Sequence, residues 1–250
     1  MNIVESMNEN KLDINIFLLC YNESALLPHT INHYKAYLPS CKITIYDNES
    51  TDNSVEIANT LGCNVISWNS NNIIDDFKYK DIKNNCWKNV EHGWIIVADM
   101  DEFLCVTEDD LINEINLKST ILTVKGINMI GESKTLDLSD INLQIITSYF
   151  DADSENKKLC FFRNYINDMN YGLGAHGCVP TGVVKYSDKT YYNKHMSNLG
   201  LNYLISKNIN RYNRSEEMRK YNLATHYTDD ITRIQNEYNF ALNHARVFLN

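Results

Sequence analysis

The sequence of 250 residues contains only three prolines and nine glycines, and it has no low-complexity stretch or internal repeat. Linkers between domains are usually rich in such residues or in short polar ones. We therefore expect residues 1–250 to form a single domain. Hydrophobic residues make up 44% of the chain, which is enough for a substantial core and excludes disorder as a description of the whole.

Positive charge is in deficit. The chain has 23 Lys and Arg residues against 32 Asp and Glu residues, and its formal net charge is −9. A protein that binds a phosphate backbone usually concentrates Lys and Arg on one surface and carries a positive balance. We therefore expect no nucleic-acid partner.

Long apolar runs and paired cysteines are also absent. No stretch reaches the roughly 18 apolar residues of a transmembrane helix, and the first residues lack the basic and apolar regions of a signal peptide. The seven cysteines are spaced singly, as reduced core thiols are. We expect a soluble, cytoplasmic protein without a transmembrane segment. Peripheral contact with a membrane and assembly into a homo-oligomer both stay open.

Short apolar runs alternate with helical patterns in the first half, which predicts βαβ units and a parallel, doubly wound sheet. The expected strands are 14–19, 42–46, 64–68 and 94–98, and the expected helices are 23–38, 54–62 and 80–93.

The second half loses this alternation, so we expect a mixed or antiparallel extension of the sheet followed by C-terminal helices. The expected strands are 120–130, 143–150, 157–165 and 181–187, and the expected helices are 203–213 and 231–249.

Polar clusters follow three of the expected strands, at the sheet edge where parallel α/β proteins bind ligands. They read "CYNES" (20–24), "YDNESTDNS" (46–54) and "ADMDEF" (98–103). In extended backbone Asp99 and Asp101 would point the same way and Glu102 elsewhere. Two convergent carboxylates suit a hard divalent cation that also binds a diphosphate. The alternative for this motif alone is a solvated acidic turn.

The ordered set "CYNE", "IYDNESTD" and "WIIVADMDEFL" resembles the nucleotide-binding half of GT-A glycosyltransferases, and is most similar to family 2 and family 92 related enzymes with a DxDEF motif. The resemblance covers about residues 12–105, and 106–250 would form the acceptor-side half. It implies a Rossmann-like, mainly parallel sheet flanked by helices, and a Mn²⁺ or Mg²⁺ cofactor. It also implies a nucleoside diphosphate sugar donor, of UDP type, and a hydroxyl acceptor on a glycan, lipid or protein.

The resemblance also implies roles for individual residues of the first half. Tyr21, Asn22 and Glu23 would line the nucleotide pocket, and Asp47 would bind the base. Asn48 stands where many relatives have a second aspartate, which leaves the choice of base open.

The DxDEF motif and its surroundings supply the remaining donor-side residues. Asp99 and Asp101 would hold the metal, and Glu102 would support the loop or approach the sugar. Among Lys78, Lys80 and Lys83, we choose Lys83 as a contact to the diphosphate, although solvated helix lysines are common.

Late histidines are candidates for further contacts. His195 would be a metal ligand, with His226 as its competitor; Met196 replaces the aromatic residue that relatives often have after this histidine. His176 lies in the glycine-rich loop "GLGAHGCVPTG" and would contact the acceptor or a phosphate, or else be structural.

Catalysis would need Asp101, acting through the metal, and, for an inverting enzyme, a base that takes the acceptor proton. Glu132 in "NMIGESKT" is our first candidate for that base, with Asp151 and Asp153 as alternatives. Asp52 and Ser50 are more simply explained as caps of the helix that follows them.

Two other functions remain open. A GT-A fold that binds a nucleotide sugar or glycan without turnover would keep the same residues. Phosphatases of the haloacid dehalogenase type also place DxD after a buried strand, but near the start of the chain, which leaves the first two clusters unexplained.

Overall fold

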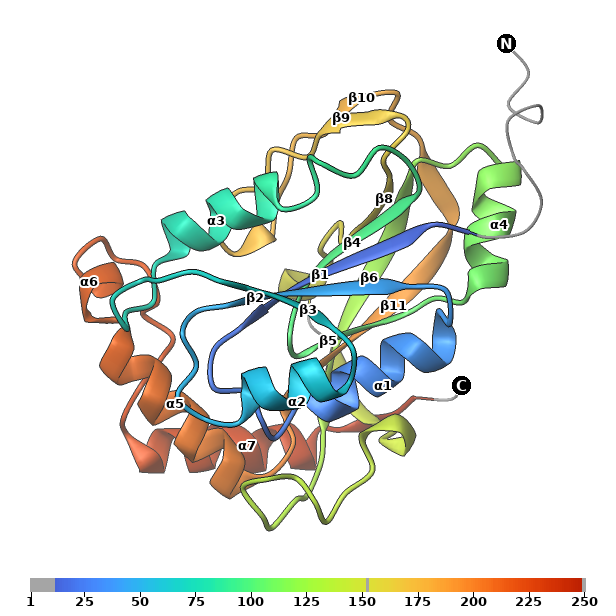
Figure 1. Cartoon of the computed structure of the whole chain (residues 1–250). Coiled ribbons are helices and arrows are strands. Elements are labelled where there is room, and N and C mark those ends of the chain that lie inside the picture. The colour runs from blue at the N-terminus through green and yellow to red at the C-terminus, as the bar shows by residue number, and fades with distance from the viewer. Residues whose placement is uncertain (1–11, 152, 249–250) are drawn as a thin grey trace.

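The computed structural model describes residues 12–151 and 153–248 (Figure 1). Four parallel strands form one side of its main sheet in the order β4-β1-β2-β3, with β3 at the edge. Their bounds are Ile14–Cys20 (β1), Lys42–Asp47 (β2), Asn64–Ser67 (β3) and Trp94–Asp99 (β4). The parallel strands predicted from the sequence are therefore confirmed, within one residue at each end.

Register brings the ends of three strands together. Cys20 of β1 pairs with Asp47 of β2, and Leu19 pairs with Asp99 of β4. The polar segments that follow these strands consequently start at one edge of the sheet, as the sequence predicted.

Three helices connect these strands: α1 (Leu27–Tyr37), α2 (Ser54–Thr60) and α3 (Asp76–Asn85). Pro28 falls at the start of α1, where a missing N–H costs no hydrogen bond. Helix α3 begins earlier and ends earlier than the predicted 80–93. The earlier start is explained by a cap: the side chain of Asp75 accepts a hydrogen bond from the backbone N–H of Lys78.

Alternate residues of β1 serve two hydrophobic cores, one on each face of the sheet. Ile16 and Leu18 are fully buried in the core that includes Tyr34 of α1. Phe17 points the other way, into the core that contains Trp87, just after α3. Figure 1 shows α1 and α3 on opposite sides of the strands. A run that is apolar at nearly every position is expected for a strand covered on both faces.

The second half extends the sheet with strands of both directions. In the described residues these are β5 (Glu102–Cys105), β6 (Ile121–Ile130), β7 (Ser148–Asp151), β8 (Cys160–Phe162), β11 (Tyr186–Asn198) and β12 (Arg246–Val247). Strands β9 (Ile166–Asp168) and β10 (Thr181–Gly182) form a separate small sheet. Strand β11 runs parallel to β6 and antiparallel to β5. The predicted mixed extension is therefore confirmed.

Several boundaries in this half differ from the prediction. Strand β11, the longest strand described, was not predicted because it is rich in polar residues and lacks regular alternation. The predicted strand 143–150 divides into the 3₁₀ turn η2 (Leu143–Ile145) and β7, and 181–187 divides between β10 and β11. Helix α4 (Glu108–Asn116) was also missed, although Thr107 and Asp110 form a capping box at its start.

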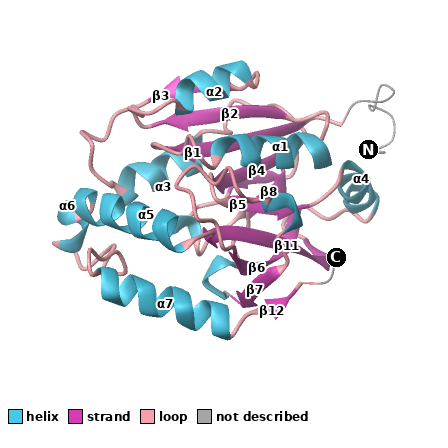
Figure 2. Ribbon diagram, turned by 90° about the horizontal axis from the view of Figure 1, so that it is seen from below, coloured by secondary structure: helices cyan, strands magenta, loops and turns pink. Residues whose placement is uncertain are grey.

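The C-terminal helices α5 (Leu201–Arg214), α6 (Glu216–Arg219) and α7 (Ile231–Asn243) gather at one end of the sheet, far from α4 (Figure 2). Helix α7 ends before the predicted 249, and β12 follows it. Two more 3₁₀ turns, η3 (Asp153–Glu155) and η4 (Leu173–Ala175), lie between β7 and β10. The predicted α/β class with C-terminal helices is confirmed.

All seven cysteines lie in the described residues as free thiols. Of the helices described, none combines the length and the apolar character needed to span a membrane.

Candidate active site

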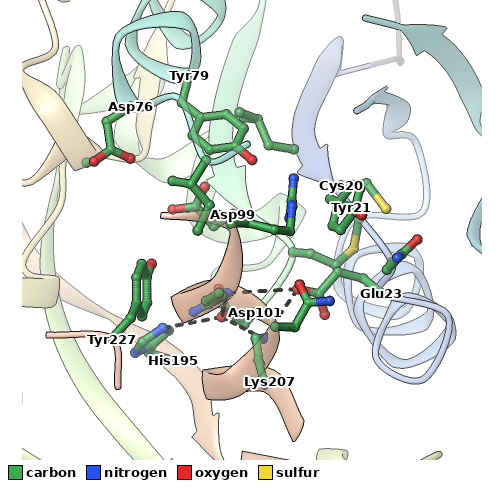
Figure 3. A pocket seen from close by; sticks show the side chains of 18 of the residues that line it. Cys20, Tyr21, Glu23, Asp76, Tyr79, Asp99, Asp101, His195, Lys207 and Tyr227 are labelled. Carbon is green, nitrogen blue, oxygen red and sulfur yellow. Dashed lines mark hydrogen bonds and ion pairs between the residues drawn. The ribbon is translucent and has the colours of Figure 1, made fainter. Parts of the chain in front are cut away.

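A pocket of about 720 Å³ opens at the edge where β1 and β4 end. Its walls come from both halves of the chain: the segment after β1, helix α3, the turn after β4, the η3 and η4 segments, β11 and α5. Figure 3 shows side chains from the segment after β1, from α3, from β11 and from α5 around Asp99 and Asp101. The polar clusters that follow β1 and β4 therefore meet in one cavity.

The turn that carries the two aspartates is held in place by buried polar contacts. The hydroxyl of Thr30 donates to the carbonyl of Met100 at 2.7 Å, and the hydroxyl of Tyr34 donates to the carbonyl of Glu102 at 2.7 Å. On the other side the N–H of Met196 donates to the carbonyl of Asp101 at 2.7 Å. Helix α1 and strand β11 thus fix the backbone from two directions.

Glu102 faces away from the pocket, as predicted. Its side chain is fully buried and accepts a hydrogen bond from the N–H of Asp99 at 2.7 Å. Its other carboxylate oxygen lies 2.9 Å from the ammonium of Lys157. Glu102 therefore supports the turn and does not line the cavity.

Asp99 is paired with two buried lysines. Its carboxylate lies 2.8 Å from the ammonium of Lys83 and 3.3 Å from that of Lys157. Burial by itself would raise the pKa of Asp99, but Lys83 and Lys157 lower it by more, so the pKa is below its ordinary value. The predicted contribution of Lys83 to this site agrees with its position, while Lys157 was not predicted.

Asp101 meets a second group of cations. One of its oxygens, Oδ2, lies 3.1 Å from Lys207, 3.4 Å from Arg211 and 3.6 Å from His195. Burial would raise the pKa of Asp101, but Lys207 and then His195 hold it well below the usual range. The structure therefore brings Asp101 and His195 together, as the sequence predicted.

Two contacts fix the imidazole of His195. Its Nδ1 lies 2.6 Å from the amide oxygen of Asn128, and its Nε2 faces Asp101. Burial lowers the pKa of His195, but Asp101 raises it by more, and the net pKa is above the ordinary value.

Helix α5 supplies the charges that sequence reasoning missed. Tyr203, Lys207, Arg211 and Arg214 are spaced four, four and three residues apart, which puts them on one face of a helix, and all four line the pocket. The first three of these residues lie in the predicted helix 203–213, although nothing in the sequence showed that the helix would face the DxDEF motif.

Glu23 is joined to this face of α5. Its carboxylate lies 3.4 Å from the ammonium of Lys207 and 3.9 Å from the guanidinium of Arg211. Burial raises the pKa of Glu23 above its ordinary value despite these cations. Lys207 consequently bridges Glu23 and Asp101 (Figure 3).

The other two predicted residues after β1 also line the pocket. The Tyr21 ring lies under the guanidinium of Arg214, 3.2 Å from the ring centroid, and its hydroxyl donates to the side chain of Asn72. Asn22 adopts a positive φ of 51°, and its amide oxygen accepts a hydrogen bond from the N–H of Thr51 at 2.7 Å. The first and second polar clusters are thus tied to each other.

Asp47 and Asn48 are not among the residues that line this pocket. Both are buried and satisfied by local hydrogen bonds: Asp47 accepts from the N–H and hydroxyl of Ser50, and Asn48 is paired with Ser70. These contacts shape the loop after β2, and the role of Asp47 toward the base stays a prediction.

The predicted helix caps are corrected as well, since Asn53 occupies the N-cap of α2 and makes no side-chain cap hydrogen bond. Asp52 instead accepts hydrogen bonds from the N–H groups of Ser24 and Ser54, and so connects two loops. Ser50 accepts from the N–H of Asn22 at 2.9 Å.

The predicted base, Glu132, is exposed and lies outside the pocket. Asp151 is also outside, paired with Lys125 at 3.1 Å and Arg246 at 2.6 Å. The side chain of Asp153 is not among those the structure describes.

Glu155, two residues further along, does line the pocket. It is buried, and its carboxylate lies 3.2 Å from the ammonium of Lys157. A Cβ at Gly126 would come within 2.4 Å of the Glu155 carbonyl oxygen, so β6 passes against this segment at a distance that only glycine permits. Sequence reasoning had no signal for Glu155, which sits in a short turn without a motif.

His176 and His226 both line the pocket. The Nδ1 of His176 lies 2.7 Å from the carbonyl of Ser154, beside Glu155. Burial lowers the pKa of His226 below its ordinary value. Of the predicted histidines, His195 is the one in contact with Asp101.

The predicted metal ligands have suitable chemistry, but here their carboxylates are engaged in ion pairs. Carboxylate oxygen and imidazole nitrogen are ordinary ligands of Mn²⁺, and carboxylate oxygen is one of Mg²⁺. Among the described residues, however, no three acidic, histidine or cysteine side chains are arranged to hold an ion. Asp99 and Asp101 would have to exchange lysine or arginine for a metal.

Residues 15–104 match the model of a family described as Glycosyl transferase family 2. Protein RfbJ of Shigella flexneri is 33% identical over 58 residues, which are 23% of this chain and 45% of that protein. The uncharacterized glycosyltransferase RT0209 of Rickettsia typhi (strain ATCC VR-144 / Wilmington) is 25% identical over 225 residues, 87% of this chain and 66% of that protein. The chain spans less than two thirds of the length of either relative.

Solved structures with a similar chain trace include S. aureus TarS 1-349 in complex with UDP-GlcNAc. It has 13% identity and a TM-score of 0.43, over 92% of this chain and 72% of TarS 1-349. Glucosyl-3-phosphoglycerate synthase from Mycobacterium tuberculosis, in complex with Mn²⁺, UDP and glucosyl-3-phosphoglycerate, has 14% identity and a TM-score of 0.32, over 46% of this chain and 44% of that one.

The matched segment ends at the last residue of "WIIVADMDEFL" and contains all three polar clusters. The GT-A fold class is confirmed by the observed sheet order. The resemblance drawn from the motifs is confirmed as well, since the model of the family 2 glycosyl transferases matches residues 15–104.

Proposed function

We propose that this protein transfers a sugar from a nucleoside diphosphate sugar, of UDP type, to a hydroxyl group of a glycan, lipid or protein acceptor. The observation that carries the proposal is the pocket at the ends of β1 and β4, where Asp99 and Asp101 meet cations from both halves of the chain. The family 2 match over the same strands supports the reaction class.

The proposed cofactor is Mn²⁺ or Mg²⁺, held by Asp99, Asp101 and His195. When bound, the ion would supply positive charge that offsets the charge developing on the departing diphosphate. The 3.6 Å contact between Asp101 and His195 supports their joint use as ligands.

For an inverting reaction a base must take the proton of the acceptor hydroxyl. We now assign this role to Glu155 and no longer to Glu132, because Glu155 lines the pocket and belongs to residues 106–250, which we expect to bind the acceptor. Asp76 of α3 is the competing carboxylate: it also lines the pocket, and burial raises its pKa above the ordinary value. The ammonium of Lys157 lies 3.2 Å from the Glu155 carboxylate and holds it from one side.

The test is a donor screen. The protein is incubated with UDP-, GDP- and TDP-sugars and Mn²⁺, with and without excess chelator, and the released sugar is measured. Metal-dependent release from one donor is the expected result, and Asp101→Asn should lose it. Thermal stabilisation by a nucleotide without any released sugar would instead support a binding module with a GT-A fold.

A further inference from the structure

The Lys and Arg side chains of α5 are concentrated at the pocket, although the chain as a whole is acidic. The chain carries a formal net charge of −9, yet the described residues that line the pocket include six Lys or Arg against five Asp or Glu. Buried ion pairs add little stability compared with apolar packing, because each charge must first lose its water. Retaining several of them around one cavity indicates that the cavity receives an anion.

Lys207 and Arg211 are the two α5 cations that contact Asp101. Both contact the same oxygen of Asp101, Oδ2, that His195 faces, and both also contact Glu23. A divalent ion held by Asp101 and His195 would compete with the two cations for this oxygen. Once displaced from Asp101, the ammonium and guanidinium would remain beside the ion, where the oxygens of a diphosphate would also bind.

We propose that Lys207 and Arg211 exchange Asp101 for the donor's diphosphate, so that this face of α5 is the diphosphate-binding wall of the pocket. The inference rests on the proposed function and deepens it, since it names residues outside the family-matched segment as donor-binding residues. Ammonium and guanidinium groups both bind phosphate oxygens strongly, and the guanidinium can do so with two parallel hydrogen bonds.

If Lys207 exchanges Asp101 for the diphosphate, one substitution should weaken the binding of diphosphates and strengthen the binding of a metal ion alone. Lys207→Met should weaken binding of UDP and of inorganic pyrophosphate about tenfold, because a charge-assisted contact is lost. The same variant should bind Mn²⁺ alone more tightly than the wild type, because Asp101 has one competitor fewer. A variant that is merely damaged would lose both kinds of binding.

The experiment measures binding by isothermal titration calorimetry with uridine, UMP, UDP and pyrophosphate, each with Mn²⁺, and with Mn²⁺ alone. It compares the wild type with Lys207→Met, Arg211→Met and Lys220→Met. Lys220 is an exposed lysine outside the pocket, so its variant controls for the loss of one charge. Uridine binding should be the same in all four proteins, and Lys220→Met should bind every probe as the wild type does.

Replacing Lys207 leaves Glu23 and Asp101 without one of their cations, so the variant's melting temperature is recorded as well. If Lys207→Met does not fold, Glu23→Gln provides the second test. It frees Lys207 from one competing carboxylate and should tighten pyrophosphate binding about threefold.

The outcomes separate the two proposals. If UDP binds the wild type and both α5 variants equally, the exchange is wrong and the proposed function stands. If pyrophosphate binds in an α5-dependent way but no nucleoside diphosphate binds better than pyrophosphate, the diphosphate wall stands and the nucleotide-sugar function is wrong. Absence of binding by both ligands would overturn both.

Discussion

Asp99 and Asp101 lie two residues apart on one turn, but their counter-charges differ in origin and in exposure. The lysines that hold Asp99, Lys83 and Lys157, have side chains only 4% and 5% exposed. The side chains of Lys207 and Arg211, which hold Asp101, are 12% and 33% exposed. All four cations line the pocket, but those of Asp101 are the more exposed, so a ligand in the pocket can replace them more readily.

The largest expected effect is on the Asp99 side. Lys157 contacts Asp99, Glu102 and Glu155, and Lys157→Met would leave these carboxylates without their shared cation. We expect the free energy of unfolding, measured by urea denaturation, to fall by about 3–5 kcal/mol. Lys207→Met should lose clearly less, because Lys207 is itself closer to solvent and Arg211 still contacts both of its carboxylate partners. If the free energy of unfolding fell equally in the two variants, the proposed difference between the Asp99 and Asp101 sides would be wrong.

The next effect is on turnover. Asp101→Asn should lower the rate of donor turnover about 1000-fold, because the metal that would stabilise the departing diphosphate loses a ligand. Asp99→Asn should also lower the rate, but it should cost more stability, since two buried lysines lose their partner. Both quantities are measured on the same preparations. Undiminished turnover in Asp101→Asn would refute the assignment of the site.

Glu155 offers a third test, now of the acceptor side. Glu155→Gln should lower turnover about 100-fold while the dissociation constant for UDP stays unchanged, because the change removes a base and no donor contact. Glu132→Gln is the matched control and should behave like the wild type, since Glu132 is exposed and outside the pocket. If Asp76→Asn abolishes turnover and Glu155→Gln does not, Asp76 is the base.

The smallest expected effect is a dependence of the free energy of unfolding on pH, which arises from His33 of α1. His33 is buried, its Nε2 lies 3.0 Å from the carbonyl of Leu104, and its ring stacks on Phe103. Burial lowers the pKa of His33 below 6.5, so its contribution to stability is present above pH 6.5 and is lost as the pH falls through the lowered pKa.

Urea denaturation at pH 7 and pH 5 measures this loss. His33→Gln should reduce the difference between the two pH values, while the lowered pKa of Asp99 matters only below about pH 3.8. An unchanged difference in the variant would assign the loss to His29 or His226, whose pKa values are also lowered.

The first and second halves of the chain also differ in how much of their structure could be predicted from the sequence. The strands before residue 100 are apolar runs bounded by polar clusters, so both their positions and the meeting of Tyr21, Asn22 and Glu23 with Asp99 and Asp101 followed from the pattern. That Asp47 and Asn48 are absent from the pocket lining could not be predicted, because the pattern shows where a strand ends but not which way the following side chains turn.

The second half gave weaker signals. Helix α5 was predicted as 203–213, but its position beside the DxDEF turn depends on contacts between distant parts of the chain, such as Lys207 with Asp101, that leave no local pattern. His195 was predicted through the family resemblance, and Glu155 could not be predicted at all because a short turn carries no periodicity.

A substitution at Gly126 would disturb this site, although Gly126 does not itself line the pocket. Its N–H donates to the side chain of Asn156, and any larger residue would press on the backbone of Glu155. Adding a single methyl group there would displace the carboxylate next to the pocket while leaving every lining residue chemically intact. Among natural variants of this chain, a change at position 126 should therefore mimic the loss of an active-site side chain.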